Sequence, residues 1–235
     1  MNDQSCFKGF PVECVKFYND LRKNNTKKWF DEHKTEFENY VMEPARDFVM
    51  EMGMILKKIS PAIIADTRYS KSIFRPFRDI RFSKDKKPYK THLGIFFWEG
   101  RLAKMDCPGY YFHLEPPMLM IAAGNHCFSK SMLDLYRKAV VDPKFGKALS
   151  RAAKDVKSKG DYHLGEKQYK QVPRGYDKNH ENAEFLLFGG LTAWTEIMIP
   201  DEFYSYDIVS YCFNKFKDLS PIHKWLVKMI ERIEK

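Results

Sequence analysis

One stretch of the sequence concentrates side chains that can bind an anion. Residues 75–92 read Arg-Pro-Phe-Arg-Asp-Ile-Arg-Phe-Ser-Lys-Asp-Lys-Lys-Pro-Tyr-Lys-Thr-His. The guanidinium fork of arginine binds carboxylate or phosphate through two parallel hydrogen bonds, and the amides of a turn can add donors. The stretch therefore predicts a site for a small phosphorylated or carboxylated ligand. The residues expected to form it are Arg75, Arg78, Asp79, Arg81, Ser83, Lys84, Lys86, Tyr89 and Lys90, with His113, Glu115 and Arg174 from elsewhere in the chain.

The net charge of the chain lies almost entirely in this region. Between Arg68 and Lys104 the sequence has eleven basic and three acidic residues, a net charge of +8 out of +9 for the whole chain. Positive charge concentrated in this way attracts small anions, nucleic acids or membrane headgroups. In an extended segment Arg78 and Arg81 face opposite sides. We therefore expect one of them to lie against a carboxylate (Asp79, Asp85 or Glu115) and the other to face a cleft.

Two other interpretations of the stretch stay open. It could contact phosphates as a nucleic-acid-binding module, or its charges could pair internally in a non-catalytic interaction protein. A concave pocket of roughly 300–1,000 Å³ would favour a small ligand, and a flat basic stripe would favour nucleic acid. We expect no tight sequence-specific duplex binding, because the segment has no recognisable reading helix or zinc-finger spacing.

A few residues could do acid–base or metal chemistry. Asp79, His113 or Glu115 could act as acid or base, but no spacing requires catalysis. His113-Leu-Glu115 could place two metal ligands on one strand face, with His92 or His126 nearby. The deaminase signature that begins in this way also needs Pro-Cys-x-x-Cys, which the chain lacks. A hydrogen-bonded strand histidine is the preferred interpretation, so we predict no metal and no cofactor.

Several segments share their residue order with one known family. They are Asn24-Asn-Thr-Lys-Lys-Trp-Phe30, residues 77–92, Pro108-Gly-Tyr-Tyr-Phe-His-Leu-Glu-Pro116 and Val172-Pro-Arg-Gly-Tyr-Asp177. Together they resemble the family called domain of unknown function 2461, conserved hypothetical proteins of bacteria and fungi, from roughly Phe10 to Leu226. Ala123-Gly124 stands where that family often has a glycine pair. The resemblance implies one compact domain and implies no particular activity, substrate or cofactor.

The hydrophobic pattern indicates the elements that must position these residues. Apolar residues at helical spacing predict helices before residue 60 and after residue 130, and period-two alternation predicts strands between them. This order favours an α+β fold, one domain over residues 1–235 with its core at about 10–233, in which helices from both ends flank an antiparallel sheet of about four to six strands. The specific expectations are helix over 27–59 with a break near Pro44, strands over 72–77, 93–98, 110–115, 118–122 and 191–199, and two C-terminal helices separated at Ser220-Pro221.

Cysteine use and hydropathy bear on the compartment. The five cysteines are widely scattered, which predicts free thiols in a reducing cytoplasm. We find no run of about 18 apolar residues that could span a bilayer, and the first ten residues do not read as a signal peptide. The sequence does not set an oligomeric state.

Overall fold

The computed structural model describes residues 7–232, and within them the strands form one open antiparallel sheet. Its six strands lie in the order β1-β2-β3-β4-β6-β5. The bounds are β1 Ile63–Ile64, β2 Leu93–Glu99, β3 Gly109–Glu115, β4 Met118–Asn125, β5 His163–Leu164 and β6 Leu191–Met198. The predicted fold class and the predicted size of the sheet are confirmed.

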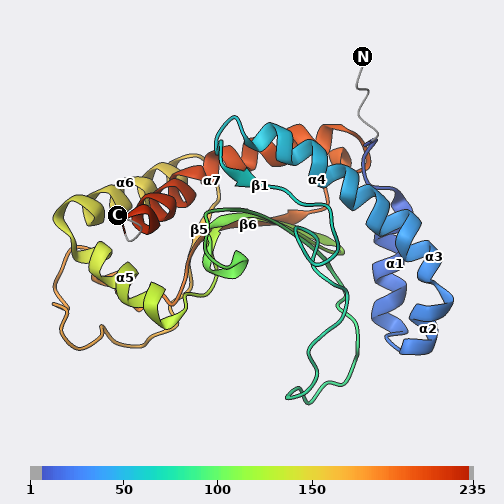
Figure 1. The fold of residues 1–235 in the computed structure, drawn as a ribbon, viewed down its shortest axis with the longest axis horizontal. Helices are drawn as coiled ribbons and strands as arrows, with labels where there is room; N and C mark the ends of the chain where they lie inside the picture. The colour runs from blue at the N-terminus through green and yellow to red at the C-terminus, as the bar shows by residue number, and fades with distance from the viewer. Residues whose placement is uncertain (1–6, 233–235) are drawn as a thin grey trace.

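Helices from both ends of the chain cover one face of this sheet (Figure 1). The α-helices are α1 Val12–Lys23, α2 Lys27–Glu32, α3 Lys34–Phe37, α4 Glu43–Leu56, α5 Lys130–Val141, α6 Pro143–Ser158 and α7 Asp207–Glu231. A π-helical turn occupies Glu38–Met42, and 3₁₀ helices occupy Lys104–Asp106, Ala183–Leu187 and Asp201–Tyr204. None of the helices within residues 7–232 combines the length and the apolar character needed to cross a bilayer.

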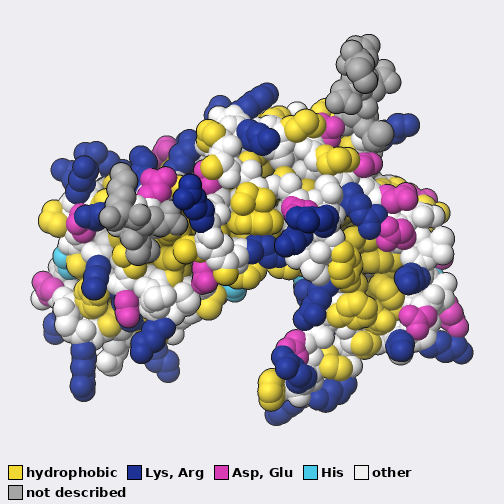
Figure 2. Space-filling view, in the orientation of Figure 1, with side chains coloured by type: hydrophobic (Ala, Val, Ile, Leu, Met, Phe, Trp, Pro, Cys, Tyr) yellow, Lys and Arg dark blue, Asp and Glu magenta, His cyan; other side chains and the backbone are white. Residues whose placement is uncertain are grey.

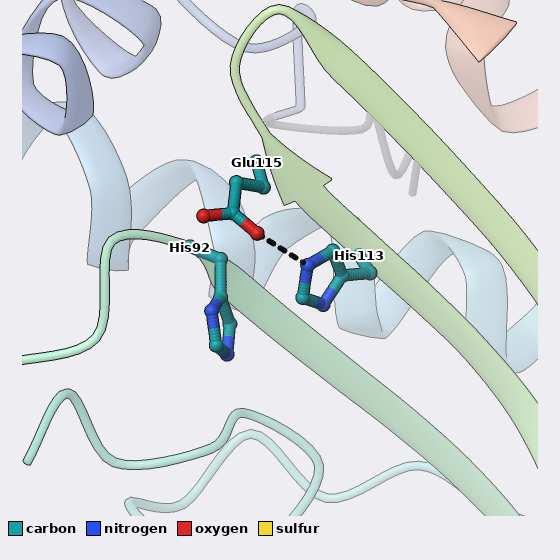
Figure 3. A group of neighbouring side chains, drawn as sticks. All are labelled: His92, His113 and Glu115. Carbon is teal, nitrogen blue, oxygen red and sulfur yellow. Dashed lines mark ion pairs between the residues drawn. The ribbon is translucent and has the colours of Figure 1, made fainter. Parts of the chain in front are cut away.

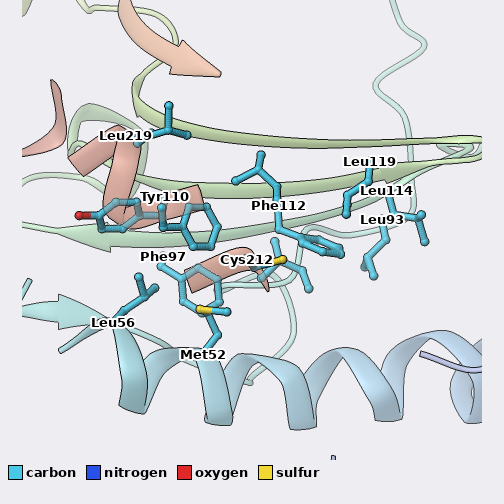
Figure 4. Close-up of a cluster of buried hydrophobic side chains, with 14 of the residues drawn as sticks. Met52, Leu56, Leu93, Phe97, Tyr110, Phe112, Leu114, Leu119, Cys212 and Leu219 are labelled. Carbon is cyan, nitrogen blue, oxygen red and sulfur yellow. The ribbon is translucent and has the colours of Figure 1, made fainter. Parts of the chain in front are cut away.

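The main core lies between the sheet and helices α4 and α7 (Figure 4). Alternation along β3 turns Tyr110, Phe112 and Leu114 toward the helices, and all three are fully buried. Met52 of α4 and Leu219 of α7 pack against this layer and are equally inaccessible. Burying a large apolar side chain contributes about 1.5–3 kcal/mol relative to leaving it exposed. Because these side chains point into the core, the side chains that alternate with them along each strand lie on the other face of the sheet.

Pro44 and Pro221 both lie in helical segments, and the structure accommodates each of them in a different way. Near Pro44 the predicted interruption is the π-helical turn that ends at Met42; a widened turn accommodates a residue that lacks the N–H and crowds the preceding turn. The prediction of two C-terminal helices is wrong, because α7 runs through Pro221. Pro221 cannot donate to the carbonyl of Lys217, and the hydroxyl of Ser220 donates to that carbonyl instead, at 2.8 Å.

The predicted strand over 72–77 is also wrong. Ile73 makes one isolated bridge to Ile95, and Phe77 makes another to Tyr89. Proline cannot donate to a sheet ladder, and Pro76 and Pro88 sit on opposite sides of the second bridge. Residues 75–90 therefore form a long projecting excursion, here called the basic arm, which extends away from the sheet in Figure 1.

The base of the basic arm is held by one buried side chain. The amide of Asn25, which follows α1, donates to the carbonyl of Tyr89 at 2.9 Å and accepts from its N–H at 3.0 Å. The Tyr89 ring stacks on Phe30 with centroids 4.0 Å apart. Asn25 does not cap the next helix, because the side chain of Thr26 caps α2. Asn25 instead ties the N-terminal helices to the arm.

Candidate functional site

The sheet face that α4 and α7 leave open carries a cavity of about 630 Å³. Figure 2 shows the molecule hollowed between the basic arm and the side that carries α5. Strands β2, β3, β4 and β6 supply the floor, and Phe74, Glu166 and Gln168 contribute from flanking segments. The volume is in the range of small-molecule sites.

Strand register explains which side chains reach this cavity. His113 of β3 lies opposite Gly94 of β2 and Met120 of β4, and Met120 lies opposite Glu196 of β6. The next row along the same face consists of Phe96, Tyr111, Ala122 and Trp194. Residues two apart on a strand share a face. The residues between the positions of these two rows point into the core, so the polar and aromatic residues of the rows point into the cavity. The result is a recess with aromatic walls and a few polar groups.

A cluster of two imidazoles and a carboxylate lies at one end of the cavity (Figure 3). His92 immediately precedes β2, and His113 and Glu115 lie two apart on β3. One ligand atom from each lies within 4.8 Å of the others, and His113 Nε2 is 3.6 Å from Glu115 Oε2. The imidazole centroids of His92 and His113 are 4.3 Å apart. The sequence placed His113 and Glu115 on one face with His92 or His126 nearby, and the structure brings His92 to them.

Burial governs the protonation of this cluster. It lowers the pKa of His92 to about 4, with further lowering by the neighbouring His113 and Lys90. Burial also lowers the pKa of His113, although Glu115 opposes the shift. Burial raises the pKa of the Tyr111 hydroxyl, which is hydrogen-bonded to His113 Nδ1 at 2.9 Å. Both imidazoles are therefore neutral at pH 7, so each has one nitrogen lone pair.

Two lysines lie against Phe74, a residue of the cavity wall, but neither lines the cavity itself. Lys104 Nζ lies 4.5 Å and Lys90 Nζ lies 5.4 Å from the centroid of the Phe74 ring. Burial lowers the pKa of both ammonium groups. Lys104 donates to two backbone carbonyls. Lys90, the last residue of the segment 75–90, is half-buried and makes no ion pair with any carboxylate in residues 7–232, so it is a positive charge next to the cavity wall.

The basic arm pairs most of its predicted site residues with one another. Arg81 donates to Asp79 from Nε at 3.0 Å and from Nη2 at 2.7 Å, and hydrogen bonds from Arg81 lower the pKa of Asp79 to about 2. Arg78 Nη1 donates to Asp85 at 2.8 Å. Lys86 Nζ donates to the carbonyl of Ile80. These contacts agree with the interpretation in which the charges of the stretch pair internally.

Within the described residues, no side chain of the basic arm lines the cavity. Arg78 is half-buried with its side chain 30% exposed, and Arg81 is 76% exposed. Arg78 therefore has a carboxylate partner as expected, but Arg81 does not face a cleft. The remaining members of the predicted set lie apart from the cavity: Arg75, Ser83, Lys84 and Lys86 on the arm, and Arg174 in an exposed loop.

One family of known proteins matches this chain over most of its length. The profile of the family described as conserved hypothetical proteins (DUF2461) matches residues 13–225. The chain belongs to this family. No curated protein and no solved structure matches it. The matched residues include every strand of the sheet and both sides of the cavity, so the cavity lies within the part of the chain that defines membership of the family.

The site residues predicted from the sequence do not include most of the residues that line the cavity. Phe74, Phe96, Trp194 and Glu196 all line it, and none was proposed as a site residue. A signal was present in β6, where Thr192, Trp194 and Glu196 alternate with buried neighbours. That pattern shows that a strand has two different faces. Only the pairing of β6 with β4 places Trp194 and Glu196 on the face that carries His113.

Proposed function

We propose that this protein binds a small molecule with an anionic group, a phosphate or a carboxylate, in the cavity on the open face of the sheet. The apolar body of the ligand packs on the aromatic walls, and its anionic group contacts Lys90. The proposal keeps the class of ligand that the sequence suggested and moves the site from the basic arm as a whole to the cavity, with Lys90 at the base of the arm as its cation.

The observation that carries this proposal is the unpaired ammonium group of Lys90. It is half-buried beside Phe74, which lines the cavity, and its charge acts on the nearby imidazole of His92. A partly buried charge without a partner is unfavourable, and an anion bound there would offset that cost. Charge-assisted hydrogen bonds contribute about 1.5–3 kcal/mol, enough to select an anionic ligand over its neutral analogue.

Thermal melts with pairs of metabolites test the proposal. Each phosphate- or carboxylate-bearing compound is compared with its dephosphorylated or amide analogue, and each hit is titrated by calorimetry. We expect Lys90→Gln to weaken binding of a hit by about 10- to 100-fold. Lys84→Gln, which removes the same charge from the arm, is the matched control and should bind normally. Equal binding of charged and neutral analogues, or an equal loss in both variants, would contradict the proposal.

If the bound molecule reacts while no metal ion occupies the cluster, His113 and Glu115 are the groups positioned to move a proton. Both lie at the cavity end where Lys90 would hold the anionic group.

We further propose that the protein acts in the cytoplasm, because Cys14, Cys127 and Cys212 are free thiols.

A second candidate function rests on the tip of the basic arm. Phe82 is 94% exposed there, with the guanidinium of Arg81 5.8 Å from its ring centroid. An exposed aromatic ring among cations can stack on a base while the lysines contact phosphates. We propose weak binding of single-stranded nucleic acid without sequence preference as the alternative role of the arm.

Fluorescence anisotropy with a labelled oligonucleotide tests this alternative. We expect binding that falls steeply between 50 and 200 mM salt, on the order of tenfold or more, because counterions are released. Phe82→Ala should weaken it by about 1–3 kcal/mol, and Tyr69→Ala, which removes an exposed ring outside the arm, is the control. Nanomolar binding to one duplex sequence over a random duplex would refute the expected lack of specificity.

A further inference from the structure

We propose that His92, His113 and Glu115 bind a divalent transition-metal ion, with zinc the best match, at the end of the cavity. The inference does not depend on the anionic ligand, because it rests on the donor atoms alone. The three side chains come from two adjacent segments of the sheet and converge in Figure 3. Sequence analysis had favoured a hydrogen-bonded role for His113.

The donor atoms are spaced as metal ligands are. In a tetrahedral zinc site with bonds of about 2.0–2.1 Å, two ligand atoms lie about 3.4 Å apart. His113 Nε2 and Glu115 Oε2 are separated by 3.6 Å. That separation is too long for a hydrogen bond, so the imidazole and the carboxylate face each other without one. An ion between them would satisfy both atoms.

The third ligand is within reach of the same point. All three donor atoms lie within 4.8 Å of one another, so a small rotation of His92 brings its nitrogen to bonding distance. Two imidazoles and one carboxylate suit zinc or iron(II), whereas magnesium and calcium prefer oxygen donors. The donor set therefore favours a transition metal.

Neighbouring groups orient the ligands. Tyr111 Oη is 2.9 Å from His113 Nδ1. When Nδ1–H donates to that hydroxyl oxygen, the lone pair of Nε2 faces Glu115. The hydroxyl of Thr91 donates to Glu115 Oε1 at 3.0 Å, which leaves Oε2 toward the imidazole. Metal-binding histidines usually have such a partner on their other nitrogen, and its loss weakens metal binding by about 10- to 100-fold.

The site would be open on one side. Three protein ligands leave at least one coordination position for water or for an added molecule, as in catalytic rather than structural zinc sites. His92 and His113 both line the cavity, so the open position faces the space available to a small molecule. The guanidinium of Arg22 lies 3.8 Å from Glu115 Oε1, the oxygen that is turned away from the imidazole, and so does not occupy the ion's place.

Metal titration of the chelator-treated protein tests the proposal. Calorimetry with zinc chloride is expected to show one ion per chain, and cobalt(II) should give the visible spectrum of a tetrahedral or five-coordinate site. We expect His113→Asn and Glu115→Gln to weaken zinc binding by about 100-fold or more, and Tyr111→Phe by about 10- to 100-fold. His126→Asn is the matched control, because His126 also lines the cavity but lies outside the cluster.

A second measurement does not depend on whether the variants fold. X-ray absorption of the zinc-loaded parent should show only nitrogen and oxygen ligands, with scattering from two imidazoles. Sulfur in the coordination sphere would point to Cys127 at the cavity wall and would overturn the assignment. Absence of stoichiometric binding to the parent, or undiminished binding to a folded Glu115→Gln variant, would overturn it as well.

Discussion

Replacing His223 by alanine is expected to lower the free energy of unfolding by about 3–5 kcal/mol, because it removes a large buried side chain and a hydrogen bond to a carboxylate. His223 lies on α7 and is fully buried, and its Nε2 is 2.7 Å from Glu99 Oε2 at the end of β2. The imidazole also stacks on Tyr110, with centroids 4.4 Å apart. Its loss leaves the Glu99 carboxylate, which is 13% exposed, without this partner. Urea denaturation of parent and variant measures the difference.

The double variant His223→Leu/Glu99→Leu is the control for this prediction. Replacing both members of a buried pair by apolar residues of similar size is often neutral. We therefore expect the double variant to be closer to the parent than His223→Ala is. A single variant that unfolds at the same urea concentration as the parent would show that the pair contributes little.

The same pair predicts a dependence of stability on pH. Burial lowers the pKa of His223, although Glu99 opposes the shift, and within residues 7–232 its Nδ1 has no hydrogen-bond partner. A second proton on that nitrogen would be buried and unsatisfied, so the ring is neutral in the folded state. The ordinary pKa of histidine is about 6.5. Below that pH the unfolded chain takes up a proton that the folded chain does not, so stability is complete above about pH 6.5 and falls below it.

Melting temperatures measured from pH 7.5 down to about 5 check this sign. Other groups titrate in the same pH range. The informative quantity is therefore the difference in melting temperature between the parent and His223→Gln at each pH. The amide of glutamine can still donate to Glu99 but does not titrate. We expect the parent to lose more stability than the variant as the pH falls, and parallel curves would contradict the assignment of a neutral imidazole.

Substitution of Gly124 by alanine is expected to destabilise the protein by about 3–5 kcal/mol. Gly124 lies near the end of β4 with φ +128°, a conformation that favours glycine. A Cβ atom there would lie 2.1 Å from the carbonyl oxygen of Leu191 on β6. Backbone cannot move aside as a flexible side chain can, so the pairing of β4 with β6 must shift. This pairing also builds the cavity floor, so ligand binding should be lost together with stability.

Gly175→Ala is the matched control, because it separates the two causes. Gly175 also has positive φ, +88°, but a Cβ atom there meets nothing within 4 Å. We expect this variant to lose only the backbone strain, about 1–3 kcal/mol, and to keep its cavity. If both variants lose the same stability by denaturant titration, the contact with Leu191 does not matter.

The sequence by itself determined the class of fold and the two faces of its strands. Period-two alternation in residues 110–115 separates Tyr110 and Phe112 from His113 and Glu115, and the structure keeps that division. Asp142-Pro143 has the pattern of a helix start, a capping residue followed by a first-turn proline, and Asp142 accepts from the N–H groups of Lys144 and Phe145. These features follow from local rules, because side-chain direction and cap geometry depend on residues only a few positions apart.

The tertiary structure decided the features that depend on partners far apart in the chain. Helix α7 continues through Pro221 because its apolar residues are buried along its whole length, against the sheet and against other helices such as α6, and Ser220 satisfies the freed carbonyl. The basic stretch becomes an arm because Asn25, 64 positions away, binds the backbone of Tyr89. The cavity exists because strand register aligns Trp194 and Glu196 with His113. The pattern within one strand sets its two faces but does not pair it with a particular distant strand, so the sequence could propose anion-binding residues but could not show that, among them, His113 lines the cavity while Lys90 lies against its wall.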